Sequence, residues 1–177
     1  MASVLVLAGL LGGCESEAPV VASLTVDGSI DYPGWVGGDF IVEVTDRSGT
    51  VVASQTFTGG ASVGFSASIA ANSGLHMVRA WNDSTPDGLL DPTVEAMVAR
   101  VFDAQDASIL GAVLPLETYH SISGTIWDSY WTVGNFLVVA TVQATATPVY
   151  LATSSGTAFG APYEVWVPAN SGSISIS

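Results

Sequence analysis

The sequence predicts an all-β protein made of two β-sandwiches in tandem. Val, Ile, Thr, Ser and aromatic residues alternate in short runs, which Gly, Asn, Asp and Pro interrupt. No stretch after the first 14 residues keeps a 3.6-residue apolar period. The second half of the 177-residue chain repeats motifs of the first half, and an apolar content of 49% is enough to fill real cores.

Seven strands are expected in the first half. Residues 94–103 form either a strand or one helical turn that leads into a strand, and we favour the strand. Asp46-Arg47-Ser48-Gly49 is typical of a hairpin turn. Seven short strands in about 95 residues match the scale of an immunoglobulin-like sandwich. The other six expected strands are residues 23–30, 39–46, 50–58, 63–70, 74–82 and 107–116.

The internal repeat aligns three blocks of the two halves. Gly28-Ser29-Ile30 matches Gly124-Thr125-Ile126, and Trp35 falls opposite Trp131. Gly38-Asp39-Phe40-Ile41-Val42 matches Gly134-Asn135-Phe136-Leu137-Val138 without a gap. After a two-residue shift, residues 65–74 match residues 163–172, and both blocks end in Ala-Asn-Ser-Gly. Chance similarity between β-rich segments is the alternative, but an ungapped block sharing Gly, Trp and Phe in register favours duplication.

The repeat sets the expected domain organisation, with one sandwich at residues 21–117 and a second at 118–177. Residues 172–177 correspond to the start of the strand at 74–82, and nothing corresponds to residues 83–116. The second sandwich is therefore expected to be incomplete. Either the chain is truncated at its C-terminus, which we favour, or another chain supplies the terminal strands.

The repeated pattern is Gly-[Ser/Thr]-Ile, a loop, Gly-x-Phe-[Ile/Leu]-Val, then Phe or Tyr before Ala-Asn-Ser-Gly. It resembles carboxypeptidase-regulatory-like and related prealbumin-like β-sandwich domains, which occur as repeats in bacterial surface proteins. The resemblance implies fold markers without catalytic residues. Asn-Ser-Gly is expected to close a turn that needs a positive φ. Four aromatic residues are expected to fill the space between sheets, namely Phe40, Phe65, Phe136 and Tyr163.

The N-terminus carries a short apolar run that ends in Leu11-Gly12-Gly13-Cys14. This run resembles the lipobox of bacterial lipoproteins, although no Lys or Arg precedes it. The resemblance implies a signal peptide at 1–13, lipidation of Cys14, a tether at 14–20 and a membrane-anchored protein, with the outer membrane or cell surface favoured. A spanning helix needs about 20 residues, which this run lacks. The alternative is a buried strand with a free cysteine.

The charge balance excludes several partners. The chain has 16 acidic residues, only three basic residues and a formal net charge of −13. Nucleic acid is therefore not an expected partner, because little could neutralise phosphates, and neither is the surface of an anionic bilayer. Cys14 is the only cysteine, so disulfides cannot support the fold. The expected partners are the membrane, which the lipid anchor contacts, and cell-surface proteins or glycans.

An acidic segment is the candidate metal site. Its pattern of alternating oxygen-bearing residues, with Gly88 at the sixth position, resembles an EF-hand-like calcium loop. Pro86 and the late position of Glu95 depart from that pattern. The alternatives are an acidic turn held by Asx-type hydrogen bonds or a site for another divalent ion. The candidate Ca²⁺ ligands are Asp83, Thr85, Asp87, Leu89 through its carbonyl, Asp91 and Glu95.

Catalytic motifs are missing from the sequence, so no enzyme is expected. His76 and His120 fall in predicted strands and are expected to be packed or edge residues. The sequence best fits a non-catalytic structural or interaction module of the cell envelope. The alternatives are a carbohydrate-binding module and an accessory domain of a secreted enzyme. Candidate sugar platforms, which could equally plug the sandwich ends, are Tyr32, Trp35, Trp127, Tyr130 and Trp131.

Overall fold

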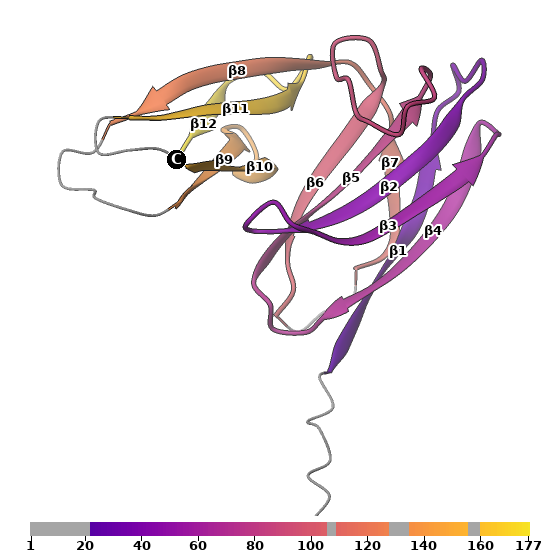
Figure 1. The fold of residues 1–177 in the computed structure, drawn as a ribbon, viewed down its shortest axis with the longest axis horizontal. Coiled ribbons are helices and arrows are strands. Elements are labelled where there is room, and N and C mark those ends of the chain that lie inside the picture. Colours follow the sequence, from indigo (N-terminus) through magenta and orange to yellow (C-terminus); the bar gives the residue numbers. More distant parts are fainter. Residues whose placement is uncertain (1–21, 106–108, 128–134, 156–159) are drawn as a thin grey trace, which may run out of the picture.

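The computed structural model describes residues 22–105, 109–127, 135–155 and 160–177. This part of the chain is all-β and has no helix, as the sequence predicts (Figure 1). Its first half contains β1 (Ser23–Asp31), β2 (Asp39–Asp46), β3 (Val51–Thr58), β4 (Ser62–Ala70), β5 (Leu75–Asp83), β6 (Met97–Asp103) and β7 (Ile109–Pro115). Its second half contains β8 (Tyr119–Ile126), β9 (Asn135–Val142), β10 (Thr147–Ser155), β11 (Ala161–Pro168) and β12 (Ile174–Ile176).

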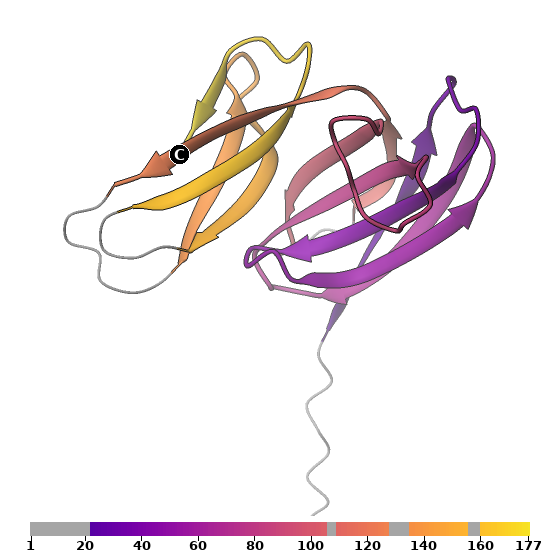
Figure 2. The ribbon, with the colours of Figure 1, turned by 45° about the horizontal axis from the view of Figure 1, so that its top comes forward.

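The strands of the first half form two sheets that pack face to face (Figure 2). One sheet has the order β4-β1-β7, and the other has the order β3-β2-β5-β6. Strands β1 and β7 pair in parallel, and the other pairings between described strands are antiparallel. Each of the seven expected strands is present, and the uncertain segment at 94–103 contains β6 rather than a helical turn.

Alternation along β2 explains how one strand serves two cores. Phe40, Val42 and Val44 point into the core between the two sheets of the first half. Ile41 points to the opposite face, where it joins a second cluster with residues from both halves of the chain. Because side chains alternate between faces with a period of two, this sheet is covered on both sides. Trp81 of β5 lies in the second cluster and is 1% exposed.

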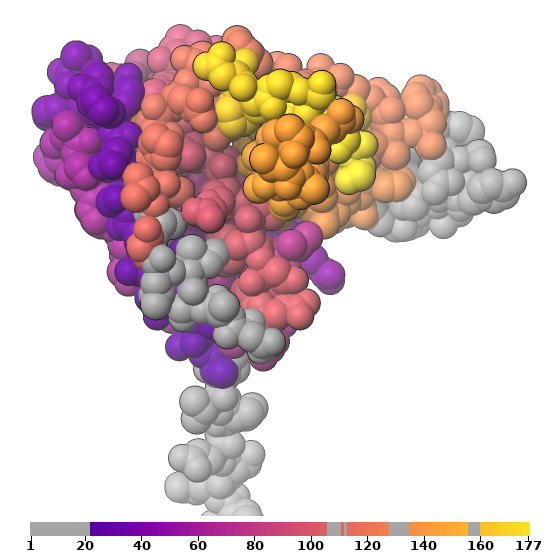
Figure 3. Space-filling model, turned by 180° about the vertical axis from the view of Figure 1, so that it is seen from behind, coloured from indigo at the N-terminus to yellow at the C-terminus, as the bar shows by residue number. Residues whose placement is uncertain are grey.

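Strands β8–β12 form a three-stranded sheet, β10-β9-β12, and a two-stranded sheet, β11-β8. They pack against the outer face of β5 and β6, so the two halves share the second core. The view from behind shows the orange and yellow second half against the pink strands of the first (Figure 3). Hydrogen bonds between described residues cross this contact, among them one from the Leu151 N–H to Met77 Sδ at 3.5 Å. The Ala99 N–H donates to Tyr119 Oη at 2.9 Å, and Thr153 Oγ1 donates to the Arg47 carbonyl at 2.9 Å.

The aligned residues of the two halves occupy equivalent places in the strand pairing. Gly28 faces Phe65 between β1 and β4, and Gly124 faces Tyr163 between β8 and β11. Strand β9 pairs with β10 and β12, as β2 pairs with β3 and β5. The β2–β3 ladder shifts register after Val44, and the β9–β10 ladder shifts at the corresponding place. The second half therefore follows the pairing scheme of the first as far as β12.

The Asn-Ser-Gly turns also correspond. Gly74 and Gly172 both have positive φ values, 81° and 72°, as expected for a residue that must enter the left-handed region. Ser73 Oγ donates to the Ala70 carbonyl, and Ser171 Oγ donates to the Pro168 carbonyl. The aromatic residues that were expected in the cores differ in how deeply they are buried. Phe40 and Phe65 are buried, whereas Phe136 is half-buried and lines a surface pocket beside Arg47.

Tyr119→Phe should lower the free energy of unfolding by about 1–3 kcal/mol, because the buried Ala99 N–H loses its acceptor. Burial raises the pKa of Tyr119 to about 12, against about 10 in the unfolded chain. The neutral phenol therefore favours folding below about pH 10, and this contribution should be lost as the pH rises to about 12. Denaturant titrations of the wild type and of Tyr119→Phe between about pH 10 and pH 12 measure this contribution. The wild type should lose unfolding free energy over this range through the ionisation of Tyr119, and Tyr119→Phe should lack that loss.

Tyr32→Phe is the matched control, because no hydrogen bond is seen for its hydroxyl within the described part of the chain. Equal stability losses in the two variants would contradict the role assigned to Tyr119.

Candidate functional site

The acidic loop between β5 and β6 lies at one end of the first sandwich. The strand pairing places the end of β1, the start of β2, the end of β5 and the start of β6 at this end. The loops at 32–38, 59–61 and 84–96 therefore share it, whereas β1 begins at the opposite end (Figure 1). The acidic loop is thus on the side of the sandwich away from the N-terminus of the described chain.

Glu95 organises this loop from a buried position, since it is only 3% exposed. Its Oε1 accepts hydrogen bonds from the Ser84 N–H at 3.0 Å, the Thr85 N–H at 3.4 Å and Thr85 Oγ1 at 3.2 Å. Its Oε2 accepts from the Asp91 N–H at 3.0 Å. One carboxylate thus holds both arms of the loop, which otherwise would leave several backbone donors unpaired.

Asp83 ends β5 and is 5% exposed. Its Oδ2 accepts from the Gly88 N–H at 3.0 Å, but its buried Oδ1 has no hydrogen-bond partner among the described residues. Gly38 packs tightly against its backbone, since a Cβ at Gly38 would lie 2.4 Å from the Asp83 carbonyl oxygen. The neighbouring Asn82 donates to the carbonyls of Gly37 and Asp39. The base of the loop is therefore fixed by close backbone packing and by a buried amide.

The other predicted metal ligands bond to their own neighbours. Asp87 accepts from the Leu89 N–H at 2.8 Å, and Leu89 itself is 69% exposed. Asp91 accepts from the hydroxyl and N–H of Thr93, which lowers the pKa of its carboxyl. Across the described ranges, no three His, Cys, Asp or Glu side chains come close enough to hold an ion. The observed contacts are those of the acidic-turn alternative, and the calcium site stays a prediction.

The candidate aromatic platforms differ in exposure. Trp35 is half-buried, donates from Nε1 to the Gly38 carbonyl at 3.2 Å and packs against the first core together with Tyr32. This is the placement of a residue that plugs the end of a sandwich. Trp127 is 74% exposed. Tyr130 and Trp131 lie outside the described residues, as does Cys14.

The two histidines also differ. His120 is exposed on β8, whereas His76 is 2% exposed and stacks on Phe102 with ring centroids 5.7 Å apart. The sequence did not predict the close packing of Gly38 on Asp83, the hydrogen bonds of Asn82 to the Gly37 and Asp39 carbonyls, or the hydrogen bond that Tyr119 accepts from Ala99. A glycine directly before the Asp39 strand was visible as part of the repeat, but its partner across the sheet was not.

Glu95→Gln should lower the free energy of unfolding by about 1–3 kcal/mol, because the amide nitrogen cannot accept from the loop N–H groups. Asp87→Asn is the control, since Asp87 is exposed and its change is expected within about 0.5 kcal/mol. Thermal melts of both variants with EDTA measure the difference. Equal melting temperatures would show that Glu95 does not hold the loop together.

The same melts with excess calcium test the predicted ion. Calcium at ten times its Kd should add about 1.4 kcal/mol by mass action, and Asp83→Asn should remove that gain. Equal midpoints with calcium and with EDTA would leave the acidic turn as the explanation of this loop.

Comparison with known proteins adds no further constraint on the site. No protein-family model, curated protein or solved structure matches the chain. Within the described residues, no helix is long and apolar enough to cross a membrane.

Proposed function

We propose that this chain is a lipid-anchored, non-catalytic module of the cell envelope with a structural or interaction role. The observation that carries the proposal is the sequence Leu11-Gly12-Gly13-Cys14 after an apolar run. Only residues 15–22 separate Cys14 from the start of β1 at Ser23. These eight residues span at most about 29 Å when extended. An acylated Cys14 would hold the first sandwich close to the membrane.

The position of β1 supports an orientation for this module. Because β1 starts at the anchor end, the loops at 32–38 and 84–96 would face away from the membrane. These distal loops expose three apolar side chains, with Val36 95% exposed, Leu89 69% exposed and Val94 67% exposed. Exposed apolar side chains beside acidic groups suit contact with a protein partner. We assign the interaction role to this distal end.

The negative charge fits the same picture. A net charge of −13 disfavours adsorption of the sandwich to an anionic leaflet, so the lipid would be the membrane contact. The same charge keeps the exposed module soluble through self-repulsion. A module of this kind extends from the membrane and presents its loops outward.

Labelling with radioactive palmitate in a bacterial host tests the anchor. The wild-type chain should incorporate palmitate and sediment with membranes, and Cys14→Ser should do neither, because the thiol is the acceptor of the lipid. Ser16→Ala is the control and should behave as wild type. An unlabelled wild-type chain recovered from the cytosol would defeat the proposal.

Carbohydrate binding is the second candidate, and the exposure of Trp127 favours it. An indole that is 74% exposed offers a face on which a sugar ring can stack. Saturable quenching of tryptophan fluorescence by a member of a glycan panel is the expected result, and Trp127→Ala should abolish it. Val113→Ala, which alters another exposed apolar residue, should leave it intact. No response to any glycan would rule against this candidate.

A further inference from the structure

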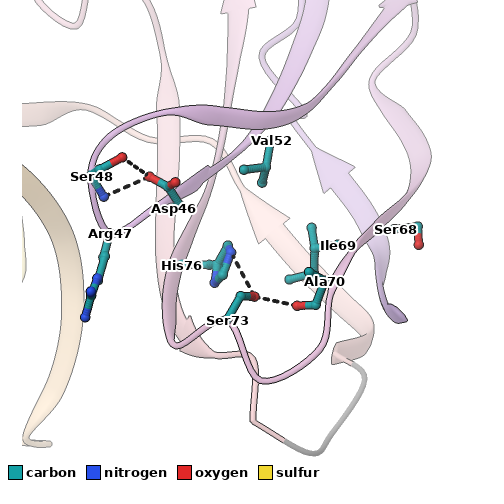
Figure 4. Close-up of a pocket in the computed structure, with 9 residues that line it drawn as sticks. All are labelled: Asp46, Arg47, Ser48, Val52, Ser68, Ile69, Ala70, Ser73 and His76. Carbon is teal, nitrogen blue, oxygen red and sulfur yellow. Dashed lines mark hydrogen bonds between the residues drawn. The ribbon is translucent and has the colours of Figure 1, made fainter. Parts of the chain in front are cut away.

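A pocket opens at the end of the first sandwich where β1 begins, opposite the acidic loop. Figure 4 shows the residues that line it. Its volume is about 330 Å³, at the small end of the range of ligand pockets. The β2–β3 hairpin and the Asn-Ser-Gly turn form its polar sides, and Val52 and Ile69 form an apolar wall. Its polar lining includes Asp46, Arg47, Ser48, Ser68, Ser73 and His76.

Within this pocket, His76 is held in one orientation. Its Nδ1 lies 2.9 Å from the Gly74 carbonyl oxygen, and its ring stacks on Phe102. A carbonyl oxygen can only accept, so Nδ1 must carry a proton. In the neutral imidazole, Nε2 then has a free lone pair. Nε2 lies 3.4 Å from Ser73 Oγ, and the dashed lines of Figure 4 show this contact.

Ser73 therefore has two acceptors for one hydroxyl proton. Its Oγ donates to the Ala70 carbonyl in the structure, and His76 Nε2 is the second acceptor within reach. Ser73 is exposed, so a molecule in the pocket can approach its oxygen. A hydroxyl beside a base, with the base oriented by a third group, is the arrangement of an activated nucleophile.

The second half of the chain shows that the turn does not need the histidine. Ser171 makes the same hydrogen bond to the carbonyl three residues earlier. At the position of His76, however, the second half has Ile174, and opposite it stands Val142 where the first half has Asp46. An isoleucine thus fits this register. The imidazole is a feature of the first half alone, beyond what the shared turn requires.

We propose that Ser73 is a nucleophile that His76 activates to accept an acyl group from an activated ester in the pocket. Ser73 Oγ bonds to the acyl carbon, and the bond between that carbon and the leaving oxygen breaks. The hydroxyl proton passes to His76 Nε2 and then to the departing alcohol. The products are O-acyl-Ser73 and the free alcohol, so atoms and charge balance. The site is one of covalent modification and does not depend on the lipid anchor.

The groups around His76 influence how the rate of Ser73 acylation depends on pH. Asp46 faces it from β2, Arg47 lies in the adjoining hairpin, and Phe102 covers it from β6. Protonated His76 donates from both nitrogens and cannot take the proton of Ser73. Acylation should therefore accelerate as the imidazole loses its proton.

The test treats the full chain with p-nitrophenyl acetate and follows acetylation by peptide mapping. The chain contains no lysine, so side-chain amines give no background, and mapping separates any acetyl on Cys14. We expect acetylation of Ser73 to exceed that of Ser171. Its rate should rise with pH and then level off once the imidazole is neutral, whereas the rate at Ser171, which lacks a neighbouring base, should keep rising with hydroxide concentration. Ser73→Ala should abolish the signal at this turn.

His76→Ile reproduces the second-half arrangement and should slow acetylation of Ser73 at least about 100-fold, the lower range for general-base catalysis. A melting curve checks that this variant folds. Equal acetylation of Ser73 and Ser171, or fast labelling of Ser73 in folded His76→Ile, would overturn the proposal. If that variant does not fold, equal pH profiles of the two serines in the wild type would overturn it. Palmitate labelling of Cys14 is read separately, so either proposal can fail alone.

Discussion

The double covering of the β3-β2-β5-β6 sheet is the constraint on which the rest of the structure depends. One face packs on β4-β1-β7, and the other packs on the second half of the chain. Strands β2, β5 and β6 must therefore be apolar on both faces, which leaves few positions for charge. Arg79 in β5 is one charged residue that this sheet does contain, and its charge is paired. The guanidinium of Arg79 forms an ion pair with Glu43 at 2.6 Å and lies over the ring of Trp81. With no cysteine beyond Cys14, apolar burial must supply the stability that small extracellular domains often draw from disulfides.

Because both faces of this sheet are apolar, the polar groups that could bind or react lie at the two ends of the first sandwich. At one end, Glu95 accepts hydrogen bonds from backbone donors of the acidic loop, and one buried oxygen of Asp83 has no partner in the part of the chain that the structure describes. At the other end, His76 and Ser73 line a pocket beside the hairpin of Asp46. Loops can hold such groups because the rigid sheets beneath them fix their endpoints. The anchor proposed at Cys14 would place the pocket near the membrane and the acidic loop far from it.

Internal repetition separates residues that the fold needs from residues that serve something else. The Ser hydroxyls of the two Asn-Ser-Gly turns make the same hydrogen bond, so that bond belongs to the turn. Tyr163 and Phe65 both face a glycine across the ladder, so that pairing belongs to the sandwich. His76 and Asp46 have apolar counterparts in the second half. A difference at an equivalent position, inside one chain, is therefore a guide to function.

The amino-acid sequence alone determined the all-β class and the positions of the first seven strands. The signals were the alternation of apolar residues and the Gly, Pro, Asn and Asp residues that mark the turns between runs. Those signals are local, because strand periodicity and turn conformation depend on neighbouring residues. The acidic loop could also be recognised in the sequence, but its hydrogen bonds could not, because Glu95 accepts from donors up to eleven residues away. Only the tertiary structure decided that Tyr119 joins β6, that both faces of one sheet are covered and that Ser73 lies beside His76. Such contacts depend on which surfaces meet in three dimensions, and the sequence pattern leaves that choice open.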